Sequence, residues 1–212
     1  MQNSDPAFSF PLTKETKINM QKQRAMIKVI VKLKSGNFAV GSYGAVISIW
    51  NPDKKILIQA WRAKGMVSDL IEIDNKDLIA GAQGNVNCIS IYKYNDDEDR
   101  YKSFDFIDSK DAMISSLVKL DNNNFIYGTM DNTLVFYNSE SNGSYIKEKE
   151  VELEQKEKYD CIYSLIKLSN GNYASTGLTI IKLINSSLLK FKKCSIFLNL
   201  VAYMKILKSI YG

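Results

Sequence analysis

Few side chains in this sequence could carry out catalysis or hold a metal ion. The 212 residues contain no histidine, which is the usual general base near neutral pH and the most common metal ligand. Catalysis by a Ser-His-Asp or Cys-His group within this chain is therefore excluded, as are zinc sites that contain histidine. The three cysteines are far apart and form no Cys-x-x-Cys pair; they are Cys88, Cys161 and Cys194. This pattern favours reduced thiols in an intracellular, cytoplasmic protein.

Three aspartates remain as candidates for acid–base or ion-binding chemistry, namely Asp69, Asp111 and Asp160. No nucleophile with a base and no second metal ligand stands at a meaningful spacing from any of them. The acidic run at 95–99 lacks the 12-residue spacing of an EF-hand calcium loop, so we expect a solvated loop there. The glycines at 81–84 lack the Gly-Lys-Ser/Thr ending of a phosphate loop. We therefore expect no catalytic residue, no metal site and no cofactor.

Length and composition favour one folded domain of ordinary size. Apolar residues make up 45% of the chain and charged residues 24%, which is close to the globular average. The net charge of +5 belongs to the C-terminal end, because all 23 acidic residues lie at or before Asp160 and seven lysines follow it. No apolar stretch is long enough to cross a bilayer, and the first residues have no apolar signal-peptide core. We expect no membrane span.

An eight-residue segment recurs four times and organises the chain. Each copy begins with Met or Cys and has apolar residues at its second, fifth, sixth and eighth positions. The starts are 40, 47 and 48 residues apart, a period that suits a unit of four antiparallel strands. The copies are Met26–Leu33, Met66–Ile73, Met113–Leu120 and Cys161–Leu168.

The residues that follow each segment also recur. A polar turn leads into a short apolar strand with a glycine near its end, then a second turn and a strand rich in β-branched and aromatic residues. The glycines are Gly41, Gly81, Gly128 and Gly177. We expect them to allow a close backbone approach or a bend. Another recurring place holds Trp50, Tyr92, Tyr137 and Ile184, which we expect to be core residues.

At these residues the chain resembles the WD-repeat family of β-propellers. The best match is GTMDNTLVFYN at Gly128–Asn138, where Asp131 stands at the family's conserved aspartate; GSYGAVISIWN at Gly41–Asn51 matches at Gly-Ser and Trp. The Gly-His dipeptide is absent throughout, and Trp50-Asn51 and Tyr137-Asn138 replace Trp-Asp. The resemblance covers about residues 26–185 and implies an all-β fold of four-stranded antiparallel blades.

The repeats divide the chain into three parts. An N-terminal extension at 1–25 precedes WD-like repeats at 26–187, with boundaries near 26–65, 66–112, 113–160 and 161–187, and a basic, apolar tail follows at 188–212. The fourth repeat has few turn-forming residues after Gly177, so the sequence there predicts a strand that continues without a hairpin turn. The tail is interpreted as a displaced strand with a helix, as a misread end of the coding sequence, or as a surface-binding helix. About four blades imply a small or partial ring: a fragment, part of a larger ring, or a half that pairs with another copy.

The resemblance implies a non-catalytic scaffold for protein–protein interaction. Partners would dock on the loop face around the central channel, at the turns that join the outer strand of one blade to the inner strand of the next. These turns are expected at Ala63–Gly65, Ser109–Asp111 and Lys158–Asp160. The expected partner-facing residues on this rim are Arg62, Lys64, Asp69, Asp111 and Asp160.

The same residues allow a second functional hypothesis. A propeller enzyme, or a binder of small ligands or ions, would use the acidic residues at the channel mouth, and it would need them to converge. For the scaffold we expect other proteins as partners, no nucleic acid, and self-association where a ring has to be completed. Fold and function are separate inferences, because one fold hosts many sites.

Overall fold

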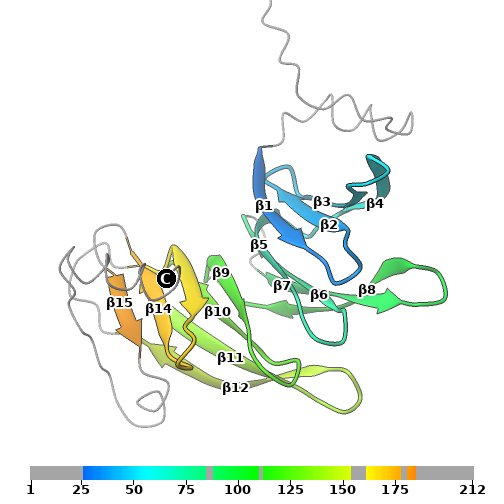
Figure 1. Ribbon diagram of the computed structural model, residues 1–212. Coiled ribbons are helices and arrows are strands. Elements are labelled where there is room, and N and C mark those ends of the chain that lie inside the picture. Colours follow the sequence, from blue (N-terminus) through cyan, green and yellow to red (C-terminus); the bar gives the residue numbers. More distant parts are fainter. Residues whose placement is uncertain (1–25, 85–87, 110–111, 154–160, 178–180, 185–212) are drawn as a thin grey trace, which may run out of the picture. The chain divides into compact units, whose positions relative to one another are not determined.

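The computed structural model describes residues 26–84, 88–109, 112–153, 161–177 and 181–184, and all of its regular structure there is β-strand. The strands form antiparallel sheets in which each strand is hydrogen-bonded to the next along the chain (Figure 1). We call each such sheet a blade. The all-β prediction is confirmed. The N-terminal extension, the tail at 188–212, Asp111 and Asp160 lie outside the described residues.

The first compact unit contains the first two blades. The first blade consists of β1 (Ile27–Lys32), β2 (Phe38–Ser42), β3 (Val46–Asn51) and β4 (Ile56–Arg62). The second blade consists of β5 (Met66–Glu72), β6 (Leu78–Gln83), β7 (Cys88–Asn95) and β8 (Arg100–Asp108).

The second compact unit contains the other two blades and, in addition, residues 73–75. The third blade consists of β9 (Ile114–Lys119), β10 (Phe125–Thr129), β11 (Thr133–Ser139) and β12 (Tyr145–Glu152). Three strands of the fourth blade are described: β13 (Ser164–Lys167), β14 (Tyr173–Thr176) and β15 (Ile181–Ile184).

Two strand predictions differ from the structure. The chain does reverse in the fourth repeat, because Thr176 of β14 pairs antiparallel with Ile181 of β15. Few turn-forming side chains mark this reversal, so the sequence pattern missed it. The alternation of apolar and charged residues at Glu150–Glu154 predicts the outer strand of the third blade there, but that strand begins at Tyr145. Tyr145 is anchored by its ring, which packs 5.4 Å from the ring of Phe125.

A β-bulge explains the unusual spacing of apolar residues in the recurring segment. In a plain strand, residues 2 and 5 of the segment would point to opposite faces. The pairing register skips the third residue in three blades, at Lys28, Ser68 and Ser115. The extra residue turns the second and fifth positions to the same side of the sheet. Val67 and Leu70 are the example in the second blade, and both are fully buried.

In each blade, the pairing register puts the recurring aromatic position where the sequence predicts it. Each member pairs with the first residue of the neighbouring strand, as Tyr92 does with Leu78 and Tyr137 with Phe125. Tyr92, Tyr137 and Ile184 are buried, whereas Trp50 is half-buried. The indole N–H of Trp50 donates to Ser48 Oγ at 2.9 Å. The place therefore serves packing, and a hydrogen bond satisfies the polar edge of its largest member.

Candidate functional site

The contact between successive blades rests on a glycine of the second strand. A β-carbon on Gly41 of β2 would lie 2.5 Å from Val67 Cγ1, and one on Gly128 of β10 would lie 2.6 Å from Ile162 Cγ2. Val67 and Ile162 are the second residues of their recurring segments. The glycine thus leaves the space into which the next blade inserts an aliphatic side chain.

The pairing register corrects the place of the fourth glycine. Gly41, Gly81 and Gly128 each pair with the fourth residue of the preceding segment, which is Val29, Asp69 and Ser116 respectively. In the fourth blade the residue that pairs with the equivalent Ser164 is Thr176. Thr176, and not Gly177, therefore occupies this place.

Charged pairs join the first turn of one blade to the first strand of the next. In the second unit the Lys119 ammonium bonds to Asp74, and Lys167 Nζ lies 2.9 Å from Asp121 Oδ2. Both lysines are the seventh residue of their segment, and both aspartates directly follow the eighth. In the first unit the two residue types are interchanged, because the seventh residue is Glu72 and the residue after the eighth is Lys34. The Lys34 backbone N–H donates to Glu72 Oε2 at 2.7 Å. The pairs are exposed and add little stability, but they recur with the repeat.

A second link joins the outer strands of the first two blades. Gln59 on β4 donates from Nε2 to the Tyr101 carbonyl at 2.7 Å and accepts the Tyr101 N–H on Oε1 at 3.0 Å. Trp61 of the same strand packs its ring 5.1 Å from Tyr92 and 6.1 Å from Tyr101. One amide therefore satisfies both backbone groups of a buried tyrosine.

Hydrogen bonds of Thr129, Asp131 and Asn132 hold the WD-like hairpin of the third blade. Thr129 Oγ1 donates to Asp131 and accepts the Thr133 N–H at 3.1 Å. Asn132 has a left-handed backbone (φ 67°), and its Nδ2 donates to the Leu153 carbonyl at 2.9 Å. Asp131 thus takes part in closing the turn between β10 and β11, without any histidine.

A basic rim lies at one end of the first unit, and we define it by Lys28, Tyr43, Arg62, Lys64 and Phe106. The strand ends meet there, because the Tyr43 N–H donates to the Met26 carbonyl and the Ala63 N–H to the Ala45 carbonyl. Lys28 Nζ lies 5.9 Å from the centre of the Tyr43 ring, and Lys64 Nζ lies 4.9 Å from that of Phe106. All three basic side chains are exposed, and 52% of Phe106 is exposed. Such cation–aromatic pairs hold flexible lysines over a flat apolar surface.

The structure places three of the five predicted rim residues, and two of them fall in the basic rim. Arg62 ends β4 and Lys64 lies in the turn before β5. Asp69 is half-buried within β5, and its Oδ1 accepts the Leu70 N–H at 2.9 Å. The other two, Asp111 and Asp160, are outside the described residues. Sequence reasoning missed Lys28, Tyr43 and Phe106, although the alternation of Phe104 and Phe106 on an outer strand was a usable signal.

Two serines of β9 bond to backbone groups. Ser115 Oγ donates to the Gly128 carbonyl at 3.0 Å, and Ser116 Oγ accepts the Leu165 N–H at 3.1 Å. The first bond lies within a blade and the second joins β9 to the next blade. These serines are therefore structural groups of the sheets.

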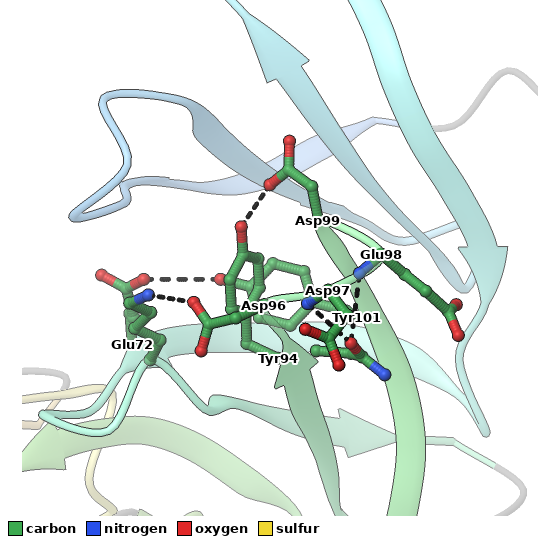
Figure 2. A network of polar contacts seen from close by, with 9 residues as sticks. Glu72, Tyr94, Asp96, Asp97, Glu98, Asp99 and Tyr101 are labelled. Atoms are coloured by element: carbon green, nitrogen blue, oxygen red, sulfur yellow. Dashed lines mark hydrogen bonds and ion pairs between the residues drawn. The ribbon is translucent and has the colours of Figure 1, made fainter.

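The acidic loop between β7 and β8 is internally bonded (Figure 2). Tyr94 donates its hydroxyl to Asp99, Lys76 pairs with Asp96, and Asn95 Oδ1 accepts the N–H groups of residues 97 and 98 at 3.0 and 3.2 Å. The bond to the Asp99 carboxylate raises the pKa of Tyr94 to about 12, since ionisation would break it. Within the described residues, no three acidic or cysteine side chains are grouped so that they could hold a metal ion.

One carboxylate of the first unit is nearly fully buried. Asp77 directly precedes β6, and its Oδ2 lies 2.6 Å from Lys93 Nζ on β7. The Lys93 ammonium also lies 4.7 Å from the centre of the exposed Phe104 ring. This pair keeps a buried charge compensated, so we assign it to the structure of the second blade.

Comparison with known proteins places the fold. No protein-family model and no curated protein matches the sequence. Similar solved structures include the mitotic checkpoint complex (TM-score 0.59, 14% identity, 71% of this chain and 45% of that one). The Cps50 (Swd1) β-propeller domain of Myceliophteria thermophila has a TM-score of 0.58, 14% identity and coverage of 76% and 54%. U3-55K has a TM-score of 0.58, 12% identity and coverage of 76% and 49%.

The chain spans about half the length of these structures. In the part of the chain that is described, no helix is long and apolar enough to span a membrane. The antiparallel blades agree with the similarity to a β-propeller domain. The chain has a β-propeller fold, with four blades recognisable.

Proposed function

We propose that this chain is a non-catalytic, cytoplasmic scaffold for protein–protein interaction, and that a partner docks on the basic rim of the first unit. The basic rim is a loop face of the kind that the WD-repeat resemblance implies. Among the described residues, Cys88 and Cys161 form no disulfide, which agrees with a reducing compartment.

The observation that carries the proposal is the pairing of each rim lysine with an aromatic ring, beside the exposed guanidinium of Arg62. Aromatic and arginine side chains dominate the binding energy of protein interfaces. The half-exposed Phe106 offers apolar area, and the three cations favour a partner segment rich in aspartate and glutamate. The partner chemistry is therefore an acidic segment that also carries an apolar side chain.

The test is a selection of peptides from a displayed random library against the full chain, followed by affinity measurement by fluorescence anisotropy. We expect the selected peptides to be enriched in acidic residues and to bind more weakly as salt is raised. Reversal of charge in Arg62→Glu/Lys64→Glu should weaken binding by about tenfold or more. The matched control is Lys54→Glu/Lys55→Glu, which makes the same charge change in the turn before β4, at the other end of the strands.

Two results would contradict the proposal. One is a set of peptides without acidic bias, or one whose affinity the rim reversal leaves unchanged. The other is equally tight binding of a DNA oligonucleotide, which would reveal a general attraction of polyanions and not a protein-docking site.

A further inference from the structure

In the second and fourth blades, the second and fifth residues of the recurring segment face the preceding blade. In the second blade these are Val67 and Leu70, and both lie against the position of Gly41. In the fourth blade Ile162 lies against Gly128, and the Leu165 N–H bonds to Ser116. The exposed fractions of these four side chains are 0%, 1%, 0% and 3% respectively.

The same positions on β1 are uncovered. Ile27 is 42% exposed and Ile30 is 60% exposed. They occupy the second and fifth places of the recurring segment, and the bulge at Lys28 again puts them on one side of the sheet. Adjacent, exposed branched residues at a place that is otherwise fully buried mark an interaction surface. We call Ile27, Ile30 and Lys32 the entry face of β1.

Lys32 adds a charge to the entry face. It is the seventh residue of its segment, as Lys119 and Lys167 are of theirs. Those two lysines pair with Asp74 and Asp121, the residues that begin the first turn of the preceding blade. Lys32 is exposed, and among the described residues no carboxylate is paired with it. The entry face therefore offers a positive charge where the repeat supplies a negative one from a neighbour.

The fourth blade of this chain has neither the glycine nor the acidic residue of these contacts. Its second strand carries Thr176 at the place of Gly41 and Gly128. At Gly128 even a β-carbon would come 2.6 Å from the inserted isoleucine, so a threonine there excludes one. The residue that begins its first turn is Ser169, which supplies no negative charge.

We propose that the entry face of β1 is a docking surface for a propeller blade that is not one of the four in this chain. The chemistry of that blade is set by the two repeated contacts. Its second strand has a glycine that receives Ile27, and its first turn begins with an aspartate or glutamate that pairs with Lys32. This proposal rests on the blade contacts and is independent of the basic rim.

The test gives the fourth blade the two missing features in the full chain, by Ser169→Asp and Thr176→Gly. A surface on one copy that matches a different surface on the next makes head-to-tail contacts. The readout is the alkylation rate of a cysteine introduced by Ile30→Cys, followed by mass spectrometry of that peptide, together with the solution mass by light scattering. We expect fast alkylation with the native fourth blade and about tenfold slower alkylation with the double variant.

Charge and shape controls identify the contact. Adding Lys32→Glu to the double variant places two like charges together and should restore fast alkylation. The triple variant Ser169→Lys, Thr176→Gly and Lys32→Glu restores opposite charges and should slow alkylation again. For the mass readout, Ile30→Arg should abolish association, whereas Ile56→Arg, at another exposed strand position, should not. The light-scattering mass tells whether the contact forms within one copy or between two.

Two outcomes would overturn the proposal. In the first, the double variant keeps its far-ultraviolet spectrum, but the cysteine at position 30 is alkylated as fast as with the native fourth blade. A glycine and an acidic residue would then not be what the entry face recognises in a blade. In the second, the native chain already protects position 30 at working concentration and Ile30→Arg makes it monomeric. The occupant would then be an unmodified second copy.

Discussion

Gly41 and Val67 lie so close that a β-carbon on the glycine would sit 2.5 Å from Cγ1 of the valine in the next blade. Gly128 and Ile162 repeat this relationship in the second unit at 2.6 Å. The glycine is needed at these places for lack of a side chain and not for its backbone freedom, because neither Gly41 nor Gly128 has a positive φ. Blades of this chain therefore stack by inserting a branched aliphatic residue over a bare backbone.

Gly41→Ala should lower the free energy of unfolding by about 1–3 kcal/mol, because the added methyl group forces the Val67 side chain or the strand to move. Combination with Val67→Ala should recover part of the loss, since the smaller side chain removes the clash. Urea denaturation of the single and double variants measures both effects. Thr176→Ala is the matched control and should change stability by less than about 0.5 kcal/mol. Strict additivity of the two changes would show that Val67 is not the residue displaced.

Gln59→Met should cost about 1–3 kcal/mol of unfolding free energy, although it preserves the side-chain length. The reason is that the N–H and carbonyl of Tyr101 would both lose their partner in a buried place. Urea denaturation gives the loss, and hydrogen exchange at the Tyr101 amide should become faster. Ala60→Ser, one residue along the same strand and exposed, should leave both measurements unchanged. Unaltered exchange at Tyr101 in the Gln59 variant would mean that water replaces the amide.

Stability should fall as the pH rises from about 10 to about 12. The pKa of Tyr94 is raised from 10.0 to about 12 by its bond to Asp99, and burial raises the pKa of Tyr101 and of Tyr127. In this window the unfolded chain loses phenolic protons that the folded chain keeps, so protons favour the folded state and their removal favours unfolding. Denaturation at a series of pH values measures the slope.

Asp99→Asn gives the control for that pH dependence. It should lower the pKa of Tyr94 toward 10.0, which ultraviolet absorbance of the tyrosinate detects, and should make the fall of stability less steep. Tyr94→Phe should remove the same component from the titration. An absorbance titration identical in the Asp99 variant would disprove the assignment of the raised pKa to this bond.

Lys93→Met should destabilise the chain by about 3 kcal/mol, because it leaves the buried Asp77 carboxylate without the ammonium that compensates it. Chemical denaturation near neutral pH measures the loss. Lys54→Met replaces an exposed lysine of the same unit and should cost less than about 0.5 kcal/mol. Equal losses in the two variants would show that the carboxylate is solvated and not part of the core.

The sequence alone determined the period, the strand order and the recurring places, because these depend on local alternation and on residues that favour turns. Met66–Ile73 and its three counterparts mark the first strand of each blade, and the glycines and aromatic residues follow at repeated distances. The structure explains the spacing of apolar residues by a bulge, since residues 2 and 5 share a face when residue 3 is extra.

Only the tertiary structure decided which residues meet across the blades. Thr176 takes the glycine place through its pairing with Ser164, and in the basic rim Lys64 lies over the ring of Phe106, 42 positions further along the chain. Gln59 and Tyr101 likewise bond across 42 positions. Contacts of this kind depend on the stacking of one sheet on the next, and no local pattern encodes them, because side chains that meet between sheets obey neither the strand period nor the turn rules.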